Sequence, residues 1–567
     1  MSDGNFDETF DFVIVGSGGG SMCAALVMRS VGKSVLILEK TDLIGGTTAR
    51  SGGVMWIPNN RFMKEDGVED SYEKAMQYLE ATAGQSLDAP GTSREKRSAY
   101  VTEGPNMIDF LVGQGIKLRR APSWPDYHDE LPGSSVPGRT VLADIFDTTE
   151  LGEWQGKLRP NFMSVPAYHS EGFEISTFKS STRGKLTMLK VGLRGAAAKL
   201  TGKSLTQAGG ALQGRMLQAA LKAGVNLRVK AAVKSFVIEN GAVKGVVADI
   251  DGREVRVGGS LGVLVNAGGF AQNQEMRDKY IPNTSTEWTA TTPGDTGEMI
   301  REMMGLGAAI GQMNERVGNQ MAFTPGAENR DGNGVDLNGV AGQMNIAKPG
   351  AILVDQSGVR FMNESGSYMA FCKNQLERHA AVPAIPSWYI FDDRHIRQYL
   401  LAGTMPGPNK PQEWYDQGYL FKADTIEALA SLIDLDPQVL KSTVERFNDG
   451  ARQGRDDDFK RGQRAYDNWL GDRYHSPSNT LAPLEKPPFY AMPMYPGDVG
   501  TYGGVVTDVY GRVLREDGSV IEGLYATGVS TASVMGRFYP GAGSSVGPSF
   551  VFGYIAAKHA ANAGNIA

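Results

Sequence analysis

The sequence predicts an α/β protein with a Rossmann-like dinucleotide-binding domain that is discontinuous in the chain and carries an inserted α+β domain. A glycine-rich turn joins a short β-branched run to a helical stretch near the amino terminus. Two further strand-like runs, far apart in the chain, end at glycines over residues 266–270 and 523–528. The 72 glycines among 567 residues indicate many tight turns and close backbone approaches.

The amino-terminal elements follow a βαβ order. A strand over residues 11–15 leads into Gly16-Ser-Gly-Gly-Gly20-Ser21, a helix is expected over 22–31, and a second strand over 34–38 closes at Glu39. In this order, glycines let the backbone approach a pyrophosphate at a helix amino terminus, while the acidic residue accepts hydrogen bonds from a ribose. Ser21 takes the third glycine position, where a small residue still permits close packing. We predict a dinucleotide contact from Gly16, Gly18, Gly19, Gly20, Ser21, Glu39 and Lys40.

A loop rich in glycine and hydroxyl groups follows over residues 44–58. It suits the ring system and ribityl chain of a flavin, and its candidate contacts are Gly45, Gly46, Thr47, Thr48, Ser51, Gly52 and Gly53. Later strands are expected over 224–229 and 232–238, with a hairpin at Asn240-Gly241 into a third strand through Val246, and over 261–265. Further cofactor contacts are expected from Ala232, Ala267, Gly268 and Gly528.

The first and last segments must meet in space if both serve one cofactor. The cofactor domain is therefore expected over residues 1–313 and 497–567, with a basic helical insertion at about 175–215. The inserted domain is expected over 314–496, with a strand over 351–355 and helices over 425–433 and 437–448.

Composition narrows the functional classes. The formal net charge of -6 argues against nucleic acid as the main partner. The acidic amino terminus lacks the features of a secretory signal, and no run approaches 18 apolar residues, so a cytoplasmic protein is expected. Cys23 and Cys372 are expected to be buried, and His379 and His395 lack a ligand spacing, so no metal site is predicted.

The quoted segments resemble the flavoprotein family of fumarate reductases, succinate dehydrogenases and ketosteroid dehydrogenases. They are residues 16–21, Glu39-Lys40, 45–48, 266–270 and 526–528. The resemblance implies FAD and a cap-like catalytic domain that closes over the flavin. The first histidine is His128, well beyond the glycine loops, so the histidine linkage of succinate dehydrogenases has no counterpart there and FAD is expected to be non-covalent.

Within that family, Tyr539-Pro-Gly-Ala-Gly543, with Ser544-Ser-Val-Gly547, resembles the 3-ketosteroid Δ1-dehydrogenases, as do residues 360–365 with Tyr368 behind them. The resemblance implies removal of a C2 proton by Tyr368 and transfer of a C1 hydride to flavin N5. It implies that Tyr539 and the Gly543 N–H hold the ketone oxygen, with Tyr127 as an accessory tyrosine. A helix beginning near Ser544 would bring Ser545 and Val546 to the flavin. Tyr490 and Tyr502 are kept as candidate pocket walls.

This chemistry needs donors where negative charge develops, because a proton beside a ketone is a poor acid. A tyrosine has an ordinary pKa of about 10, so Tyr368 acts as a base only if neighbours favour its phenolate. A separate electron acceptor must reoxidise the flavin. The alternatives are a 3-ketosteroid Δ4-dehydrogenase, a reductase of fumarate type, and a non-catalytic flavoprotein subunit.

A basic segment lies outside these motifs. Residues 179–203 hold seven lysines and arginines and no acidic residue, with leucines, methionine and valine interleaved. Such a pattern is typical of an interfacial helix attracted to anionic lipid. An exposed helix packed on the protein's own acidic surface accounts for the charges equally well. The sequence therefore leaves two hypotheses for this segment: peripheral membrane association, or a surface exposed only to solvent.

Overall fold

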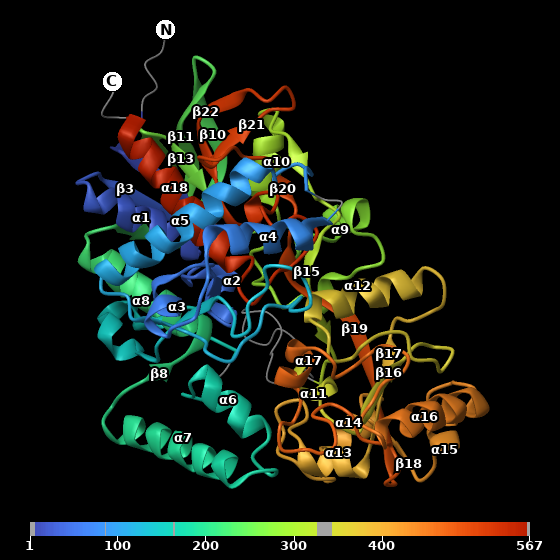
Figure 1. Ribbon diagram of the computed structural model, residues 1–567. Coiled ribbons are helices and arrows are strands. Elements are labelled where there is room, and N and C mark those ends of the chain that lie inside the picture. The colour runs from blue at the N-terminus through green and yellow to red at the C-terminus, as the bar shows by residue number, and fades with distance from the viewer. Residues whose placement is uncertain (1–5, 85–86, 163–164, 326–342, 564–567) are drawn as a thin grey trace.

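The computed structural model describes residues 6–84, 87–162, 165–325 and 343–563. A six-stranded sheet in the order β21-β22-β13-β2-β3-β9 forms the centre of the larger part, in the upper half of Figure 1. All neighbours are parallel except β21, which is antiparallel to β22. Its strands are β2 (Phe12–Val15), β3 (Val35–Leu38), β9 (Asn226–Arg228), β13 (Val263–Val265), β21 (Arg512–Leu514) and β22 (Val520–Ala526). The predicted discontinuous Rossmann-like sheet is confirmed, because β2, β13 and β22 come from three distant parts of the chain.

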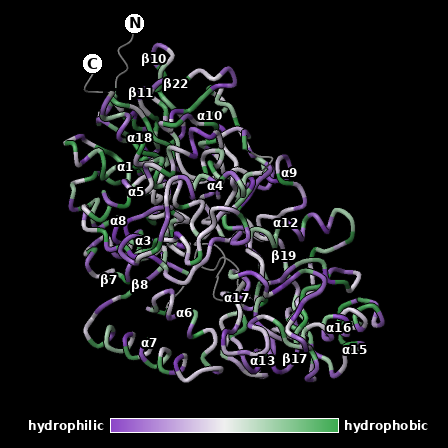
Figure 2. Tube along the Cα trace, viewed as in Figure 1, coloured by the Kyte–Doolittle hydropathy of each residue, from purple (hydrophilic) through white to green (hydrophobic). Residues whose placement is uncertain are grey.

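The two faces of this sheet are covered differently. Phe12 and Ile14 of β2 face α1 (Gly19–Ser30), α8 (Ala208–Lys222) and α18 (Val546–Ala563), whereas Val13 and Val15 face a four-stranded sheet. Figure 2 shows apolar residues along α1 and α18. The second sheet is β1 (Glu8–Phe10), β12 (Arg253–Gly259), β11 (Ala242–Ile250) and β10 (Ala231–Glu239), in that order. The predicted hairpin at Asn240-Gly241 joins β10 to β11.

Helix α1 begins three residues before the predicted start at Met22 because its first glycines pack against α18. A Cβ on Gly19 would lie 2.0 Å from Cε2 of Phe550, and one on Gly20 would lie 2.2 Å from the carbonyl oxygen of Ser549. Any larger side chain would push the two helices apart. These glycines therefore permit helix–helix packing.

The second part of the chain, at the lower right of Figure 1, is an antiparallel sheet with helices around it. Its order is β15 (Arg316–Met321), β19 (Phe489–Thr501), β17 (Ser387–Asp392) and β16 (Ala351–Val354), with β18 (Phe421–Ala423) also on β19. The α+β prediction is confirmed, and β19 continues past residue 496, the expected boundary. Its helices are α11 (Gln343–Ile346), α12 (Tyr368–His379), α13 (Asp393–Gln398), α14 (Gln412–Asp416), α15 (Ile426–Leu432), α16 (Pro437–Ala451) and α17 (Ala465–Leu470).

The basic segment folds as a helical hairpin of α6 (His169–Ser176) and α7 (Thr182–Leu200). Figure 1 shows α7 along the lower edge of the molecule, with α6 between it and the body. Helix α8, whose first half falls within the expected insertion, packs instead against α1 and α2 (Gly46–Arg50).

The remaining elements connect these parts. They are β4 (Val54–Trp56), β5 (Leu118–Arg120), β6 (Thr140–Ala143), β7 (Phe146–Asp147), β8 (Leu205–Thr206), β14 (Ile310–Gly311), β20 (Gly504–Val505), α3 (Arg61–Glu65), α4 (Tyr72–Ala83), α5 (Arg94–Gly113), α9 (Gln274–Tyr280) and α10 (Glu298–Gly305).

Candidate active site

A cavity of about 780 Å³ lies between the two parts of the molecule. Most of the predicted cofactor residues line it: Gly16, Gly18, Glu39, Lys40, Gly46, Thr47, Thr48, Ser51, Gly52, Ala232, Ala267, Gly268, Gly528, Ser545 and Val546. The predicted Gly19, Gly20, Ser21, Gly45 and Gly53 do not line it. The structure therefore brings segments from the whole chain to one cavity.

The five residues outside the lining support its walls. Gly19 and Gly20 seat α18, and the Ser21 hydroxyl accepts a hydrogen bond from Nδ2 of Asn266 at 3.0 Å. Gly45, with φ of 108°, donates its N–H to the Ser17 hydroxyl. A Cβ on Gly53 would lie 2.2 Å from the backbone of Ala208. Each position acts through packing or a backbone contact.

The amino-terminal end of α1 forms the phosphate-binding end of the cavity. Gly18 caps the helix without a side-chain hydrogen bond, so N–H groups of the first turn are open to an anion. A Cβ on Gly16, whose φ is 91°, would lie 2.4 Å from the carbonyl oxygen of Asn266. Glu39 is fixed by Ser17, whose N–H and hydroxyl donate to Oε2, and by Thr41, whose N–H and hydroxyl donate to Oε1.

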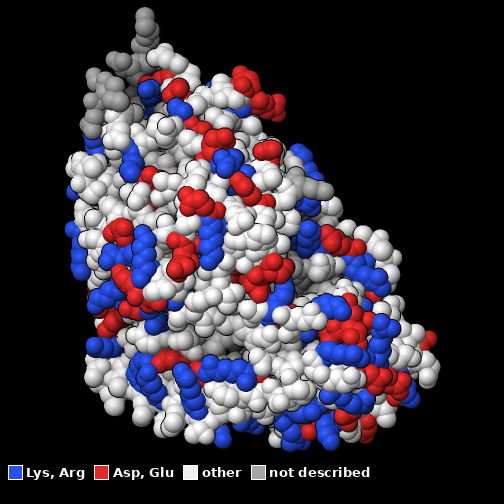
Figure 3. All heavy atoms as spheres, in the orientation of Figure 1, with Lys and Arg blue, Asp and Glu red and all other residues white. Residues whose placement is uncertain are grey.

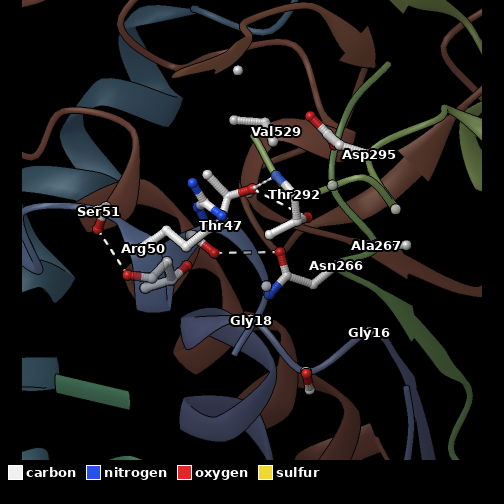
Figure 4. A pocket seen from close by; sticks show the side chains of 18 of the residues that line it. Gly16, Gly18, Thr47, Arg50, Ser51, Asn266, Ala267, Thr292, Asp295 and Val529 are labelled. Atoms are coloured by element: carbon white, nitrogen blue, oxygen red, sulfur yellow. Dashed lines mark hydrogen bonds between the residues drawn. The ribbon is translucent and has the colours of Figure 1, made fainter. Parts of the chain in front are cut away.

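Sequence reasoning missed several polar residues of this cavity, of which Asp295 and Thr292 are the clearest. Figure 4 shows Thr292 facing Thr47, with their hydroxyl oxygens 3.4 Å apart, and Asp295 beyond them. Asp295 accepts a hydrogen bond from the N–H of Gly269 through Oδ1, and burial raises its pKa to about 6. Its Oδ2 is buried and has no partner among the described residues. A turn over residues 293–297 was the available signal, but nothing local connects it to Gly268, against which Asp295 lies.

These features fit FAD. The open amino terminus of α1 suits a pyrophosphate, and the unpartnered Asp295 oxygen is an acceptor for a hydroxyl of the cofactor. Glycines 16, 268 and 528 line the cavity, and a Cβ at any of them would collide with Asn266 or Asp295, so these positions keep the backbone close to the space that the cofactor would fill. Helix α18 begins at Val546, which lines the cavity, so its positive end would favour negative charge on a bound flavin. No histidine is among the described residues that line the cavity.

Three predicted catalytic tyrosines come together from distant segments. Tyr127 lies in a loop, Tyr368 is the first residue of α12, and Tyr539 precedes α18. The ring centroid of Tyr127 is 5.4 Å from that of Tyr368 and 5.8 Å from that of Tyr539, and the last two are 5.7 Å apart. Tyr368 and Tyr539 line the cavity, whereas Tyr127 lies behind them, fully buried.

Gly543 lies close to the Tyr539 hydroxyl and also lines the cavity. Its φ is 97°, and a Cβ there would lie 2.4 Å from the carbonyl oxygen of Val54, so only glycine fits. Burial raises the pKa of Tyr539, while the hydroxyls of Ser545 and Tyr368 and the N–H groups of Ser545 and Gly543 lower it. A phenol and a backbone N–H are therefore side by side, as an oxyanion site requires.

The protonation state of Tyr368 determines whether this residue can act as a base. Burial raises its pKa well above the ordinary value, Tyr539 raises it further, and the neighbouring Tyr127 phenol lowers it. Burial likewise raises the pKa of Tyr127. All three phenols are thus neutral at physiological pH. Tyr368 is at the amino terminus of α12, whose dipole favours a negative charge by about 0.3–1 kcal/mol.

The candidate wall residues Tyr490 and Tyr502 do not line the cavity. Tyr502 donates its hydroxyl to the carbonyls of Phe538 and Ser544 and so holds the loop that carries Tyr539 and Gly543. Tyr490 packs on Phe391 in the core of the second sheet. Cys23 and Cys372 are buried and free, as predicted.

None of the helices in 6–84, 87–162, 165–325 and 343–563 combines the length and apolarity needed to cross a membrane. Within the same ranges, no three His, Cys, Asp or Glu side chains group as metal ligands would.

Known proteins share this architecture along nearly the whole chain. The model of the FAD binding domain family matches residues 11–546. The chain is 38% identical to the 3-oxosteroid 1-dehydrogenase of Mycobacterium tuberculosis, over 98% of this chain and 99% of that protein. It is 34% identical to the 4-oxocyclohex-2-ene-1-carboxylate 5-dehydrogenase of Sinomonas cyclohexanicum, over 97% and 93%.

A solved structure agrees with these relatives. The 3-ketosteroid delta1-dehydrogenase of Sterolibacterium denitrificans, in complex with 1,4-androstadiene-3,17-dione, superimposes with a TM-score of 0.90 at 34% identity, covering 98% of this chain and all of that chain. The protein therefore belongs to the FAD-binding-domain family of flavoproteins, in the group that contains the 3-ketosteroid Δ1-dehydrogenases.

Proposed function

We propose that the protein is an FAD-dependent dehydrogenase that converts 3-oxo-4-ene steroids into 1,4-dienes. The observation that carries this proposal is the convergence of Tyr127, Tyr368 and Tyr539 with the Gly543 N–H at a cavity suited to FAD. The relatives that match over the whole chain, among them one named as a 3-oxosteroid 1-dehydrogenase, support the same reaction.

The chain's own residues divide the work between binding and proton transfer. The Tyr539 hydroxyl and the Gly543 N–H hold the 3-ketone oxygen, and they strengthen their hydrogen bonds as negative charge develops there. Tyr368 removes a proton from C2, the carbon beside the ketone. FAD, when bound by the cavity residues, supplies the acceptor for the hydride that leaves C1.

Burial keeps the Tyr368 phenol neutral, so Tyr368 must pass its own proton to solvent before it can take the C2 proton. The neighbouring Tyr127 phenol lowers the pKa of Tyr368, and the amino terminus of α12 acts in the same direction. Tyr127 therefore acts as a positioning residue that eases ionisation of the base.

Anaerobic mixing of the yellow holoenzyme with androst-4-ene-3,17-dione tests the function. We expect loss of the flavin absorbance at 1:1 stoichiometry and formation of the 1,4-diene. Fumarate and 4-oxocyclohexanecarboxylate test the alternatives, the second because a relative at 34% identity acts on a ketone of that kind. Bleaching by a 5α-3-ketosteroid that yields a 4-ene would favour the Δ4-dehydrogenase instead.

We infer that FAD is held non-covalently, since no histidine is among the described lining residues. Acid precipitation of the holoenzyme should release the flavin into the supernatant. Yellow colour that stays in the pellet after washing would show a covalent link.

We also propose that the α6–α7 hairpin docks on an anionic membrane. Helix α7 exposes a stripe of leucines, whereas a helix that faces only water would expose polar side chains there. Gly184, Val191 and Ala198, seven residues apart, face the protein. Leu186, Leu189 and Leu193 are 61%, 59% and 61% exposed, and Leu200 is 88% exposed. At 100° per residue these leucines form one stripe, opposite the buried face.

The charges beside this stripe divide into two groups. Arg183, Lys190 and Arg194 pair with Glu171 or Glu174 of α6, as expected if the helix packs on the protein's own acidic side chains. Lys185, Lys199 and Lys203 form no ion pair within the described residues and flank the leucines. Figure 3 shows basic side chains gathered over this edge of the molecule. The leucine stripe favours lipid, and the inner face of the cytoplasmic membrane is the expected surface.

Sedimentation with vesicles separates the two interpretations. Replacing Lys185, Lys199 and Lys203 by Gln should weaken binding to phosphatidylglycerol vesicles by roughly 100-fold, at about 1 kcal/mol per charge, and should reduce its salt dependence. Replacing Lys422, an exposed lysine on β18, is the matched control. Unchanged vesicle binding in the triple variant would contradict membrane docking and support a helix exposed only to solvent. A concentration-dependent dimer would show that a second copy of the protein covers the leucines.

A further inference from the structure

A second aromatic cluster lies beyond the catalytic tyrosines. Trp124, which lines the cavity, stacks on Trp469 of α17 with ring centroids 4.9 Å apart. His169 of α6 stacks on Trp124 at 4.2 Å, and Phe173 packs on Trp469 at 4.3 Å. Burial lowers the pKa of His169 to about 3, so this ring is neutral.

Both indole N–H groups of this cluster lack a partner. Nε1 of Trp124 and Nε1 of Trp469 are buried, and no described residue accepts a hydrogen bond from either. A buried tryptophan ordinarily finds an acceptor, because an unsatisfied buried donor is costly. Two such donors on stacked rings, one of which lines the cavity, indicate an acceptor that arrives with a ligand.

A chain of aromatic contacts, most of it behind the cavity surface, joins these donors to the ketone site; of its members, Tyr539 and Trp124 line the cavity. Tyr539 is 5.8 Å from Tyr127, Tyr127 is 4.7 Å from Tyr466, and Tyr466 is 5.7 Å from Trp469, all measured between ring centroids. Trp124 lines the same cavity as Tyr539 and Gly543, so a rigid, flat, apolar molecule whose ketone lies at Tyr539 and Gly543 would extend through that cavity toward the indole of Trp124.

We propose that Trp124 and Trp469 form a second polar subsite, which binds a neutral oxygen at the end of the steroid remote from the 3-ketone. This inference rests on the proposed function. The neutral His169 and the two N–H donors suit a carbonyl or hydroxyl oxygen. The subsite would thus select steroids oxygenated at both ends over those that carry only the 3-ketone.

Two substrates that differ only at the remote end test the subsite: androst-4-ene-3,17-dione and androst-4-en-3-one. The wild-type holoenzyme should show a higher kcat/KM for the dione, by about 2–10-fold for each hydrogen bond. Trp124→Phe and Trp469→Phe should each lose part of this preference, chiefly through KM, while kcat/KM for androst-4-en-3-one changes less than about twofold. Trp388→Phe, on β17 against Phe421, is the control for losing an indole elsewhere.

Dissociation constants from the steroid-induced change in flavin absorbance give a readout that does not depend on turnover. The dione should bind more tightly than the mono-ketone in the wild type and about equally in the double Phe variant. Equal affinity in the wild type, or a preference that survives in the double variant, overturns the subsite. If both steroids bind but neither reduces the flavin, the proposed function fails, and the binding comparison still judges the subsite.

Discussion

The two ends of the cavity are built in different ways. The cofactor end consists largely of backbone and small side chains, such as Gly16 and Gly18, that belong to short contiguous patterns. The substrate end consists of aromatic side chains, among them Tyr127, Tyr368 and Tyr539, that come from separate segments. A cofactor site made of backbone groups needs only a local turn with small side chains around it. The aromatic substrate site, in contrast, forms only when the two parts of the chain pack together.

The largest effect is expected at the substrate end, in Tyr368→Phe. Loss of a positioned base should slow flavin reduction by about 10²–10⁴, because the phenol acts in the chemical step. Steroid affinity should stay within a few-fold. Anaerobic stopped-flow absorbance measures both quantities. Tyr490→Phe removes a phenol that lies outside the cavity and should be silent; equal losses in the two variants would contradict the assignment.

Tyr539→Phe should have the next largest effect and a different signature. It removes one of two donors to the ketone oxygen, which should cost roughly 10²–10³ in rate. Binding should weaken too, because the ketone already accepts this hydrogen bond in the ground state. The same stopped-flow titration measures the two losses. A variant that keeps the wild-type reduction rate would remove Tyr539 from the oxyanion site.

At the cofactor end, Gly19→Ala tests packing. Its Cβ would collide with the ring of Phe550, so we expect a loss of about 1–3 kcal/mol in stability and weaker FAD retention. Thermal unfolding and flavin loss on gel filtration measure these changes. Gly113→Ala, at the exposed end of α5 with open space around it, should leave both unchanged. Comparable losses in the two variants would mean that α1–α18 packing is not the cause.

The smallest expected effect is at Asp295, whose folded pKa of about 6 lies above its ordinary 3.8. The folded protein then binds a proton between these values that the unfolded chain does not, so the burial penalty is present above pH 6 and relieved below it. The penalty is at most about 3 kcal/mol. Asp295→Asn should therefore raise the unfolding midpoint of the FAD-free protein at pH 8 more than at pH 5. An equal change at both pH values would show that the folded pKa of Asp295 is not raised above its ordinary value.

Local patterns account for most of what the sequence predicted correctly. The strands β2, β3 and β13 and the glycine turn follow from short runs, because hydrophobic strands and glycine turns are encoded by neighbouring residues. The start of α1 was misplaced, since the reason for Gly19 and Gly20 lies in Phe550 and Ser549. No local pattern contains that contact.

The substrate end was predicted only through resemblance. Residues 539–543 form a recognisable segment, but nothing near Tyr466, Trp124 or Trp469 in the sequence marks them as neighbours of Tyr127. Asp295 was missed for the same reason, since its contact with Gly268 bridges two loops. A buried donor or acceptor without a hydrogen-bond partner can be identified only when all of its neighbours in the folded protein are known.

The central claim is that Tyr368 takes the C2 proton, and wash-out of deuterium from a steroid labelled at C2 tests it most directly. Loss of label to water, followed by mass spectrometry of recovered substrate, reports proton removal separately from hydride transfer. We predict that Tyr368→Phe lowers the exchange rate by about 10²–10⁴ relative to wild type, with steroid affinity nearly unchanged. Exchange at the wild-type rate in Tyr368→Phe would contradict the account and assign the base to Tyr127 or another residue.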